Sequence, residues 1–363
     1  MKICFFHAGF SQHGGIERVA SILVRSLSKK ENIEIHCLSL NFASPLDFYS
    51  IPSNVKVDYL FENPINMKKA FIKGGIQRLV KYLKNNKIDV IIACGVIYFP
   101  LACISAKLAG VRVISWEHTN PACKNEFALE GLSRSIGARF SDMNVLISQE
   151  AMAYYKNHFR KRKNTVIYNP ADNRLFETED SYQKNSKKLI SVGRLAYQKN
   201  FQILIDIAEK LLTKHEDWNW HIYGDGEQRA ELESLIFDKG LVDRVVLMGN
   251  VTDIYERYNQ YAAIVMTSRW EGFPMVLIEA AAKGLPMVSF DISTGPKEII
   301  DDGVNGFLVL RDDVDGMVAK LETLINDDEL RNKFSASAKH KARSFCVDDI
   351  SNQWCMMLEE LLL

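Results

Sequence analysis

The chain has 363 residues, which is too long for one typical domain and fits two. Hydrophobic residues make up 47% of the chain, enough for two buried cores, and charged residues make up 25%, so we expect a soluble protein. The net charge is zero. Seven cysteines without a Cys-x-x-Cys pair exclude a typical structural zinc site and predict reduced thiols in a cytosolic compartment.

The charge is divided unevenly along the chain. Residues 1–170 hold 23 Lys and Arg against 12 Asp and Glu, a net charge of +11, and the remainder holds 22 against 33, a net charge of −11. A basic first half favours an anionic lipid, a nucleic acid or a phosphorylated acceptor as partner. The alternative is a solvated surface whose partner half carries the opposite sign.

The first half alternates short apolar strands with helices. Residues 2–7 form an apolar strand rather than a signal peptide, and residues 17–28 carry apolar side chains at helical spacing. The uncharged run 90–106 is short for a membrane span, so we expect a buried strand, a loop and a helix start there, and only peripheral membrane contact. The other expected elements of this half are strands at 33–40, 89–93, 111–116 and 144–147 and a helix at 76–83.

The alternation starts again after Asn169-Pro170, a dipeptide that breaks regular structure. We expect strands at 188–192, 218–223, 245–248, 263–267 and 286–290 and helices at 200–214, 227–237, 274–283 and 350–363. This order predicts an α/β fold with two doubly wound parallel sheets, each covered by helices. The expected domains are 1–168, joined by the last helix at about 350–363, and 169–349.

Ligands of open parallel sheets bind at the carboxyl ends of the strands, and polar residues gather there in this sequence. Gly14-Gly15 follows the first strand and opens a helix, where glycines permit close approach of an anionic ligand. The pattern is not Gly-x-Gly-x-x-Gly, and a Gly-Gly turn by itself is more often structural. Arg194 and Lys199 lie in the loop after strand 188–192 and would suit a diphosphate; a solvated loop is the alternative.

The segment from Glu271 to Glu279 is the most informative. It follows an apolar strand, and Pro274 suits the first turn of a helix. The backbone N–H groups of Met275 and Val276 would then face phosphate oxygens. Glu279 lies about a turn deeper on an otherwise apolar helix, where a carboxylate needs a partner such as two ribose hydroxyls or a salt bridge.

Three weaker candidates remain. His118 follows a strand of the first domain, although a lone histidine is more often structural. The loop 295–298 follows a strand of the second domain. Asp313-x-Asp315 is formally a metal motif, but it follows no buried strand, and no metal site is expected there.

Taken together, these motifs resemble those of the retaining glycosyltransferases of family 4, which have the GT-B fold, over nearly the whole chain. The segments that carry the resemblance are Gly14-Gly15-x-Glu17-Arg18, Gly193-Arg194 with Lys199-Asn200, Gly224-Asp225-Gly226, Glu271-x7-Glu279, Gly295-Pro296-x-Glu298 and Gly303-x-Asn305-Gly306. Each segment alone is weak evidence, and the ordered set is specific.

The resemblance implies a role for each matching residue. Arg194 and Lys199 would bind the diphosphate of a nucleotide-sugar donor, Glu279 its ribose and Glu271 the sugar hydroxyls, while His118 would lie near the reacting carbon. The implied catalytic residues are His118, Glu271, Arg194 and Lys199. The implied donor-binding residues are Gly14, Gly15, Arg194, Lys199, Gly224, Asp225, Glu271, Phe273, Met275, Val276 and Glu279. No cofactor or metal is expected, because cations and helix N-termini would stabilise the leaving group.

The resemblance also implies an acceptor site in the first domain. Two basic stretches could contact a lipid-diphosphate or oligosaccharide acceptor and the inner face of the membrane: Lys68, Lys69, Lys73, Arg78, Lys81, Lys84 and Lys87, and then Lys156 and 160–163. The 295–298 loop is similar to that of members using UDP-linked galactose-type or N-acetylhexosamine sugars. Family members that build bacterial surface polysaccharides, such as capsule and O-antigen, use lipid-diphosphate acceptors at the inner, cytoplasmic face of the membrane.

Two alternatives share the same architecture. A nucleotide-sugar 2-epimerase would convert the donor without an acceptor, and a non-catalytic partner subunit would bind the donor without turnover. The four residues Arg194, Lys199, Glu271 and Glu279 argue against the non-catalytic subunit. Nucleic-acid binding is not expected, because the basic stretches lack interleaved aromatic side chains.

Overall fold

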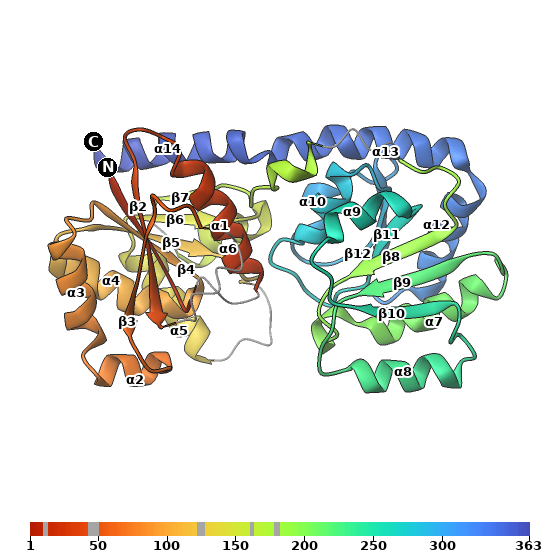
Figure 1. Ribbon diagram of the computed structural model, residues 1–363, viewed down its shortest axis with the longest axis horizontal. Coiled ribbons are helices and arrows are strands. Elements are labelled where there is room, and N and C mark those ends of the chain that lie inside the picture. The colour runs from red at the N-terminus through yellow and green to blue at the C-terminus, as the bar shows by residue number, and fades with distance from the viewer. Residues whose placement is uncertain (10–13, 43–50, 122–127, 160–162, 178–181) are drawn as a thin grey trace. The chain divides into compact units, whose positions relative to one another are not determined.

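The chain divides into two compact units in the computed structural model, which describes residues 1–9, 14–42, 51–121, 128–159, 163–177 and 182–363 (Figure 1). Unit 1 comprises Met1–Pro170 and Val347–Leu363, and unit 2 comprises Ala171–Cys346. The change of unit after Pro170 lies two residues beyond the boundary expected from the sequence.

Unit 1 is built on a parallel sheet of seven strands in the order β3-β2-β1-β4-β5-β6-β7. Its central strands are apolar on both faces, as expected of a sheet covered by helices on both sides. The strands are β1 Lys2–His7, β2 Glu34–Asn41, β3 Lys56–Phe61, β4 Val90–Cys94, β5 Arg112–Glu117, β6 Met143–Leu146 and β7 Asn164–Val166.

Helices cover this sheet through apolar stripes at helical spacing. In α1, Val19, Ile22, Leu23 and Leu27 are all buried, as their spacing predicts. The helices of unit 1 are α1 Gly15–Leu27, α2 Met67–Ile72, α3 Gly75–Asn85, α4 Phe99–Ala109, α5 Ala128–Phe140, α6 Gln149–His158 and α14 Val347–Leu362, with a 3₁₀ turn η1 at Val96–Tyr98.

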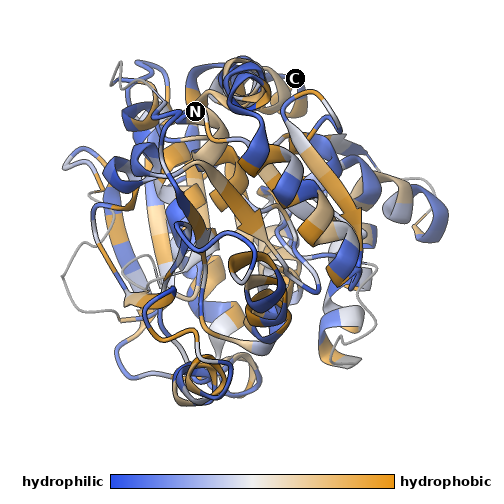
Figure 2. Cartoon of the chain, turned by 90° about the vertical axis from the view of Figure 1, so that its right-hand side faces the viewer, coloured by the Kyte–Doolittle hydropathy of each residue, from blue (hydrophilic) through white to orange (hydrophobic). Residues whose placement is uncertain are grey.

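Unit 2 repeats this design with six parallel strands in the order β10-β9-β8-β11-β12-β13. Figure 2 faces this unit and shows apolar strands enclosed by helices of mixed hydropathy. The strands are β8 Lys188–Val192, β9 Asn219–Tyr223, β10 Val245–Gly249, β11 Ala263–Met266, β12 Met287–Asp291 and β13 Gly306–Leu310.

The helices of unit 2 complete the second doubly wound layer arrangement, and the two α/β domains predicted from the sequence are thereby confirmed. The helices are α7 Phe201–Leu212, α8 Arg229–Asp238, α9 Ile254–Arg257, α10 Met275–Ala282, α11 Pro296–Ile299, α12 Val314–Asn326 and α13 Asp328–Ala342. Short 3₁₀ turns are η2 Asn173–Leu175, η3 Tyr197–Lys199, η4 Tyr258–Gln260 and η5 Arg343–Phe345.

Both sheets reverse their strand order at one point, and ligand crevices of open parallel sheets open there. The reversal lies between β1 and β4 in unit 1 and between β8 and β11 in unit 2. The carboxyl ends of these four strands are therefore the places where each unit can build a site.

The helix α14 belongs to unit 1 although it follows all of unit 2 in sequence. Its Trp354 is fully buried and packs edge-on against Trp116 of β5, with ring centroids 4.9 Å apart. The hydroxyl groups of Ser351 and Ser26 lie 3.0 Å apart and tie α14 to α1. Among the helices of the described chain, none is both long and apolar enough to cross a membrane.

Candidate functional site

The carboxyl end of β8 leads into a loop that carries two of the predicted cations. Lys199 closes η3, and Asn200 adopts a left-handed conformation (φ +56°) that starts α7. The backbone N–H of Arg269 donates to the carbonyl of Gln198 at 2.8 Å, so this loop is fixed to the loop after β11. The reversal point of unit 2 thus brings together segments some 70 residues apart in sequence.

Lys199 and Glu271 form an ion pair at this point. Lys199 Nζ lies 2.7 Å from Glu271 Oε1, and both side chains are largely buried, 17% and 9% exposed. The hydroxyl of Ser268 also donates to Oε1 at 2.7 Å, and Gln198 Nε2 donates to Oε2 at 3.4 Å. Glu271 therefore holds the Lys199 ammonium group in a defined position at the carboxyl end of the strands.

Arg194, the second predicted cation, lies in solvent at the start of the same loop. Its guanidinium pairs with Glu227 Oε2 at 3.0 Å, and the two side chains are 73% and 56% exposed. Exposed pairs of this kind contribute about 0–1 kcal/mol, so an anionic ligand can compete for Arg194 at little cost.

Gly224 has a packing reason to be glycine, apart from any role in a ligand site. It has a φ of +129°, and a Cβ there would overlap the carbonyl oxygen of Gly193. Asp225 accepts the N–H of Gly226 at 2.8 Å, and its carbonyl accepts the N–H of Leu195 at 3.0 Å. The loop after β9 thereby supports the loop that carries Arg194.

The helix α10 begins one residue later than predicted, with Pro274 as its N-cap rather than in its first turn. Pro274 is extended, with ψ at 93°, and its ring lies close to Gly295, where an added Cβ would overlap it. Met275 and Val276 form the first turn and are half-buried. Phe273 is buried, with its ring centroid 5.7 Å from that of Phe345, so its side chain contributes to packing.

Glu279 lies on the second turn of α10 and is 1% exposed. The hydroxyl of Tyr258, a fully buried residue of η4, donates to Glu279 Oε2 at 2.9 Å. A buried carboxylate requires such a donor, because burial without hydrogen bonds is costly.

The other motifs of unit 2 stabilise turns. The Thr294 hydroxyl donates to the carbonyl oxygen of Glu271 and fixes the loop before α11. Asn305 accepts from the N–H of Asp301 at 2.8 Å and donates to the carbonyl of Ile299 at 3.0 Å. Asp313 caps α12 by accepting the N–H of Gly316 at 2.8 Å. Among the described residues, no group of three or more His, Cys, Asp or Glu is placed to hold a metal ion.

The glycine loop of unit 1 brings a buried carboxylate to the end of β1. Gly14 is the N-cap of α1, and a Cβ at Gly14 would overlap the Glu17 carboxylate, whereas a Cβ at Gly15 would have no atom of the described residues within 4 Å. Glu17 Oε1 lies 3.6 Å from Nδ1 of His7, the last residue of β1. Burial raises the pKa of Glu17 and lowers that of His7 to about 4.

His118 follows β5 and faces the same edge of the unit 1 sheet. It is 9% exposed, its ring lies 4.2 Å from that of Trp116, and its Nε2 has no hydrogen-bond partner among the described residues. Burial, with a smaller effect from the charge of His7, lowers the pKa of His118 to about 3. His118 is therefore a neutral imidazole at pH 7.

A buried network that the sequence analysis missed holds the turn at His118. Glu117 is fully buried and accepts four hydrogen bonds: from Arg134 Nε at 2.7 Å, from Tyr155 at 3.0 Å, and from the N–H and hydroxyl of Thr119 at 3.1 and 2.6 Å. Arg134 comes from α5 and Tyr155 from α6, so three elements converge on one carboxylate. The signal available in the sequence was Glu117 itself, since a carboxylate ending a buried strand needs partners.

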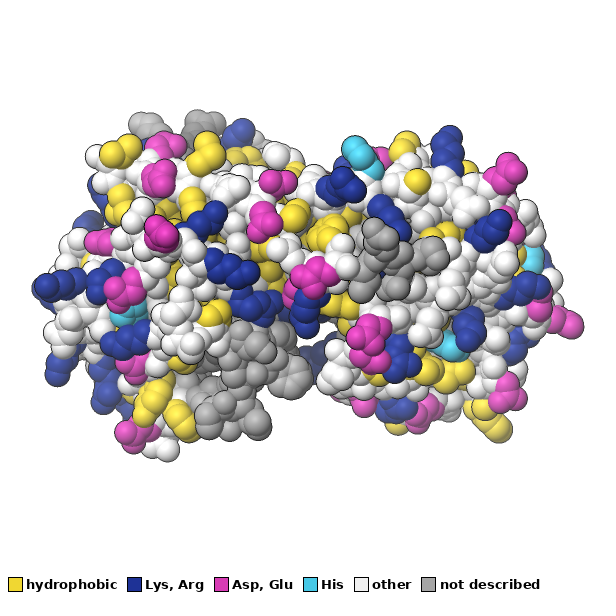
Figure 3. All heavy atoms as spheres, turned by 45° about the horizontal axis from the view of Figure 1, so that its top comes forward, with side chains coloured by type: hydrophobic (Ala, Val, Ile, Leu, Met, Phe, Trp, Pro, Cys, Tyr) yellow, Lys and Arg dark blue, Asp and Glu magenta, His cyan; other side chains and the backbone are white. Residues whose placement is uncertain are grey.

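The first basic stretch lies on α2, α3 and their flanks, and its seven cations are exposed. Beside them on α2, Phe71 and Ile72 are 36% and 77% exposed. Figure 3 shows Lys and Arg side chains along the left margin of unit 1, on the side where α3 lies. Of the second stretch, Lys156 and Lys163 are exposed, and residues 160–162 lie outside the described part of the chain.

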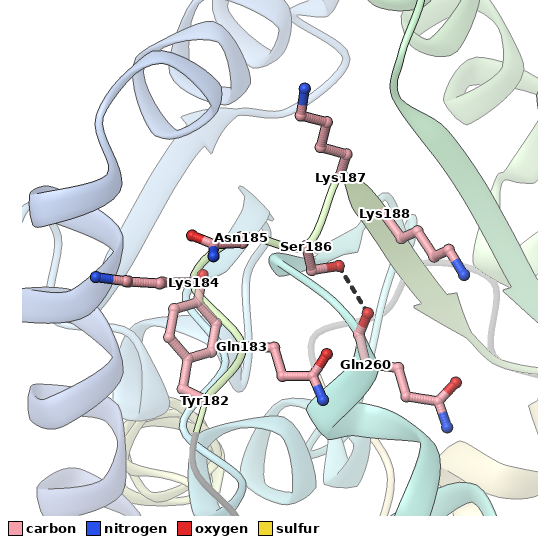
Figure 4. Close-up of a pocket in the computed structure, with 8 residues that line it drawn as sticks. All are labelled: Tyr182, Gln183, Lys184, Asn185, Ser186, Lys187, Lys188 and Gln260. Carbon is pink, nitrogen blue, oxygen red and sulfur yellow. Dashed lines mark hydrogen bonds between the residues drawn. The ribbon is translucent and has the colours of Figure 1, made fainter.

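A cavity of about 590 Å³ opens at the opposite, amino end of β8 (Figure 4). Its lining includes Tyr182, Ser186, Lys188 and Gln260, and the Ser186 hydroxyl donates to the carbonyl of Gln260 at 2.7 Å. It contains none of the residues that the sequence analysis singled out.

Two family models match consecutive parts of the chain. "Glycosyltransferase Family 4" matches residues 13–174, and "Glycosyl transferases group 1" matches residues 175–341. The junction between the two matches falls close to the change from unit 1 to unit 2.

Full-length relatives have similar descriptions. The chain is 28% identical over 363 residues to the amylovoran biosynthesis glycosyltransferase AmsD of Erwinia amylovora, covering 97% of this chain and 98% of that protein. It is 28% identical over 375 residues to the Campylobacter jejuni GalNAc-alpha-(1->4)-GalNAc-alpha-(1->3)-diNAcBac-PP-undecaprenol alpha-1,4-N-acetyl-D-galactosaminyltransferase, covering 99% of both. Anabaena HepE in complex with UDP and glucose has a similar fold, with a TM-score of 0.85, 21% identity and 99% coverage of both chains.

Proposed function

We propose, on the premise that the chain belongs to the GT-B glycosyltransferases with a Family 4 domain followed by a group 1 domain, that it is a retaining hexosyltransferase. In this proposal it moves a hexose or N-acetylhexosamine from a UDP-sugar to a lipid-linked or growing glycan in surface polysaccharide synthesis. The observation that carries the donor site is the Lys199–Glu271 pair at the strand reversal of unit 2, next to the first turn of α10.

The proposed chemistry follows from where charge develops. As the glycosidic bond to the diphosphate breaks, the leaving group gains negative charge, and Lys199, Arg194 and the N–H groups of Met275 and Val276 would stabilise it. Glu271 would orient Lys199 and would accept hydrogen bonds from hydroxyl groups of the sugar. Loss of one such cation would lower the rate by about 10²–10³, by analogy with oxyanion-hole donors.

For His118 we propose the role near the reacting carbon that the family resemblance implies. The buried, neutral imidazole of His118 adds no positive charge that would oppose an oxocarbenium-like transition state, and its Nε2 is available to a sugar hydroxyl. Gly15 has no side chain, which would let the donor phosphates come close to the backbone. We propose no metal ion or cofactor, because these groups would supply the necessary electrostatic stabilisation.

The UDP and acceptor assignments are supported by named relatives. Anabaena HepE was solved with UDP and glucose, and the Campylobacter jejuni relative is named for a diphosphate-linked undecaprenol acceptor. The exposed cations of α2 and α3, together with Phe71 and Ile72, would suit the anionic surface around such an acceptor, at about 1 kcal/mol per cation. Binding to vesicles with and without anionic lipid, at rising salt, tests this contact.

A thermal-shift titration tests the donor site. UDP, GDP and ADP are added with and without magnesium to the wild type, to Arg194→Ala, and to Lys188→Ala as a matched cation at the other end of β8. Ligand at 100 times its dissociation constant stabilises the chain by about 2.7 kcal/mol. We expect UDP alone to raise the melting temperature, without magnesium, and Arg194→Ala but not Lys188→Ala to weaken the effect.

Two outcomes would contradict the proposal. No shift with any nucleotide at millimolar concentration would remove the donor-site assignment. Conversion of the UDP-sugar to its C2 epimer in the absence of acceptor, followed by NMR, would identify an epimerase instead.

A further inference from the structure

Two loops of unit 2 carry a group of aromatic and cationic side chains next to the Lys199–Glu271 pair in sequence. Tyr197 lies in η3, in the loop after β8, and Arg269 and Trp270 lie in the loop after β11. Tyr197 is 56% exposed, and Arg269 and Trp270 are half-buried. The donor site proposed above has no role for these three side chains, which we call the aromatic platform.

The side chains of the aromatic platform contact one another. The rings of Tyr197 and Trp270 have centroids 5.9 Å apart and an interplanar angle of 52°. The guanidinium carbon of Arg269 lies 4.3 Å from the centroid of the Tyr197 ring, which is a cation–π distance, and Arg269 Nε donates to the Tyr197 carbonyl at 3.2 Å. The two rings and the guanidinium group therefore form one continuous surface.

Hydrogen bonds between the two loops fix the backbone under the platform. The N–H of Arg269 donates to the carbonyl of Gln198 at 2.8 Å, and the Gln198 amide donates to the carbonyl of Trp270 at 2.9 Å. The Thr267 hydroxyl donates to the carbonyl of Lys199 at 3.1 Å. A surface held in this way loses little conformational freedom when it binds a ligand.

The platform lies on the solvent side of the loop after β11. Ser268 and Glu271 are buried, and the Ser268 hydroxyl donates to Glu271 at 2.7 Å. Arg269 and Trp270, the two residues between them, reach solvent. A ligand on the platform would therefore bind beside the Lys199–Glu271 pair, and its place would differ from that of the donor sugar.

We propose that the aromatic platform binds a hexose ring of the glycan acceptor. The C–H groups on one face of a hexose pack against the electron-rich face of an aromatic ring. The hydroxyl groups of the hexose accept hydrogen bonds from a guanidinium group, which has five N–H donors. Tyrosine and tryptophan supply a large contact area at a low entropic cost. The choice of a glycan as the occupant rests on the proposed function.

Trp270 gives a direct readout of binding to the platform. The chain has five tryptophans, and the other four are buried: Trp116, Trp218, Trp220 and Trp354. Acrylamide, a neutral quencher of indole fluorescence, should therefore reach Trp270 first. We expect it to quench the wild-type chain more strongly than it quenches Trp270→Phe.

The probes are the methyl glycosides of galactose, glucose, N-acetylgalactosamine and N-acetylglucosamine. We expect at least one of them to protect Trp270 from acrylamide, because a sugar ring on the platform covers the indole. Glycerol at the same viscosity is the control, since it has hydroxyl groups but no ring face, and it should not protect. UDP without a glycoside should not protect Trp270 either.

Tyr197→Ala removes one ring of the platform and keeps the fluorescent one. We expect it to weaken binding of the protecting glycoside by about three- to tenfold. Phe237→Ala is the matched control, because it removes an aromatic ring of α8 that is 72% exposed, and it should leave the affinity unchanged. Both side chains are exposed, so both variants should keep the wild-type melting temperature within about 2 °C.

Four results would overturn the inference. They are wild-type quenching no stronger than that of Trp270→Phe, protection by none of the glycosides, equal affinity in the wild type and Tyr197→Ala, and protection by UDP but by no glycoside. The last result would assign the two rings to the nucleobase. The thermal-shift titration with UDP decides the proposed function separately. A chain that binds a glycoside on the platform but no nucleotide would overturn the proposed function and keep the platform as a hexose site.

Discussion

Replacing Arg134 by methionine should destabilise unit 1 strongly. The side chain is 1% exposed, and its Nε donates to the fully buried Glu117 at 2.7 Å while its NH2 group donates to Thr119 at 2.9 Å. Arg134→Met leaves the Glu117 carboxylate with three hydrogen bonds and no counter-charge. Removal of one partner of a buried ion pair costs about 3–5 kcal/mol. For a unit of this size, that corresponds to a decrease in melting temperature of roughly 6–20 °C.

The double variant Glu117→Gln/Arg134→Met makes the reasoning testable. It removes the buried charge together with its partner, and replacing a buried pair by uncharged groups is often neutral. We therefore expect the double variant to recover most of the stability lost in Arg134→Met, as followed by thermal unfolding of the full chain in near-UV circular dichroism. If the double variant is as unstable as Arg134→Met, the loss comes from packing rather than from an uncompensated charge, and the argument is refuted.

Three further predictions follow from the described geometry. Gly224→Ala places a methyl group against the Gly193 carbonyl at a φ of +129°, so it should destabilise the chain by about 1–3 kcal/mol. It should also abolish any UDP-induced thermal shift. A retained shift would contradict the supporting role of that loop. The pKa of His118 is lowered to about 3, so the folded state binds fewer protons than the unfolded state, and stability falls as pH falls below 6.5. Between pH 6.5 and 5 this amounts to about 2 kcal/mol, and urea unfolding of His118→Asn should show a correspondingly weaker pH dependence than the wild type. Glu227→Gln releases Arg194, so it should leave the melting temperature unchanged within about 2 °C while tightening UDP binding; weaker binding would show that Glu227 itself assists the ligand.

The strands and helices with strong periodicity were predictable because burial leaves a clear pattern. The strands at 2–7 and 188–192 match β1 and β8 residue for residue. The edge strands β3 and β7 were not predicted, because β3 exposes side chains such as Val57 and Tyr59 and β7 has three half-buried residues. The start of α10 was predicted one residue early, since Pro274 is compatible with both a first helical position and a cap.

Candidate site residues that follow the end of a strand could be predicted from their motifs. The residues that hold them in place could not. Lys199 and Glu271 could be named from the sequence, but their ion pair depends on the pairing of β8 with β11, which no local pattern encodes. Tyr258 is even less accessible to sequence reasoning, because a tyrosine in a polar segment resembles an exposed side chain. The roles of all the candidate site residues remain predictions.

The position of α14 has a consequence for how the chain matures during synthesis. Unit 1 lacks the helix that covers Trp116 until all of unit 2 has been translated, and at ribosomal rates of about 5–20 residues per second this delay is on the order of ten seconds or more. During that interval the indole that packs against His118 has no Trp354 over it. The order of folding would then be opposite to the order of synthesis, with unit 2 finished first and unit 1 completed by a segment that is translated after unit 2. A chain that stops directly after Cys346 would keep all of unit 2 and would lack the helix α14, which covers Trp116 of unit 1.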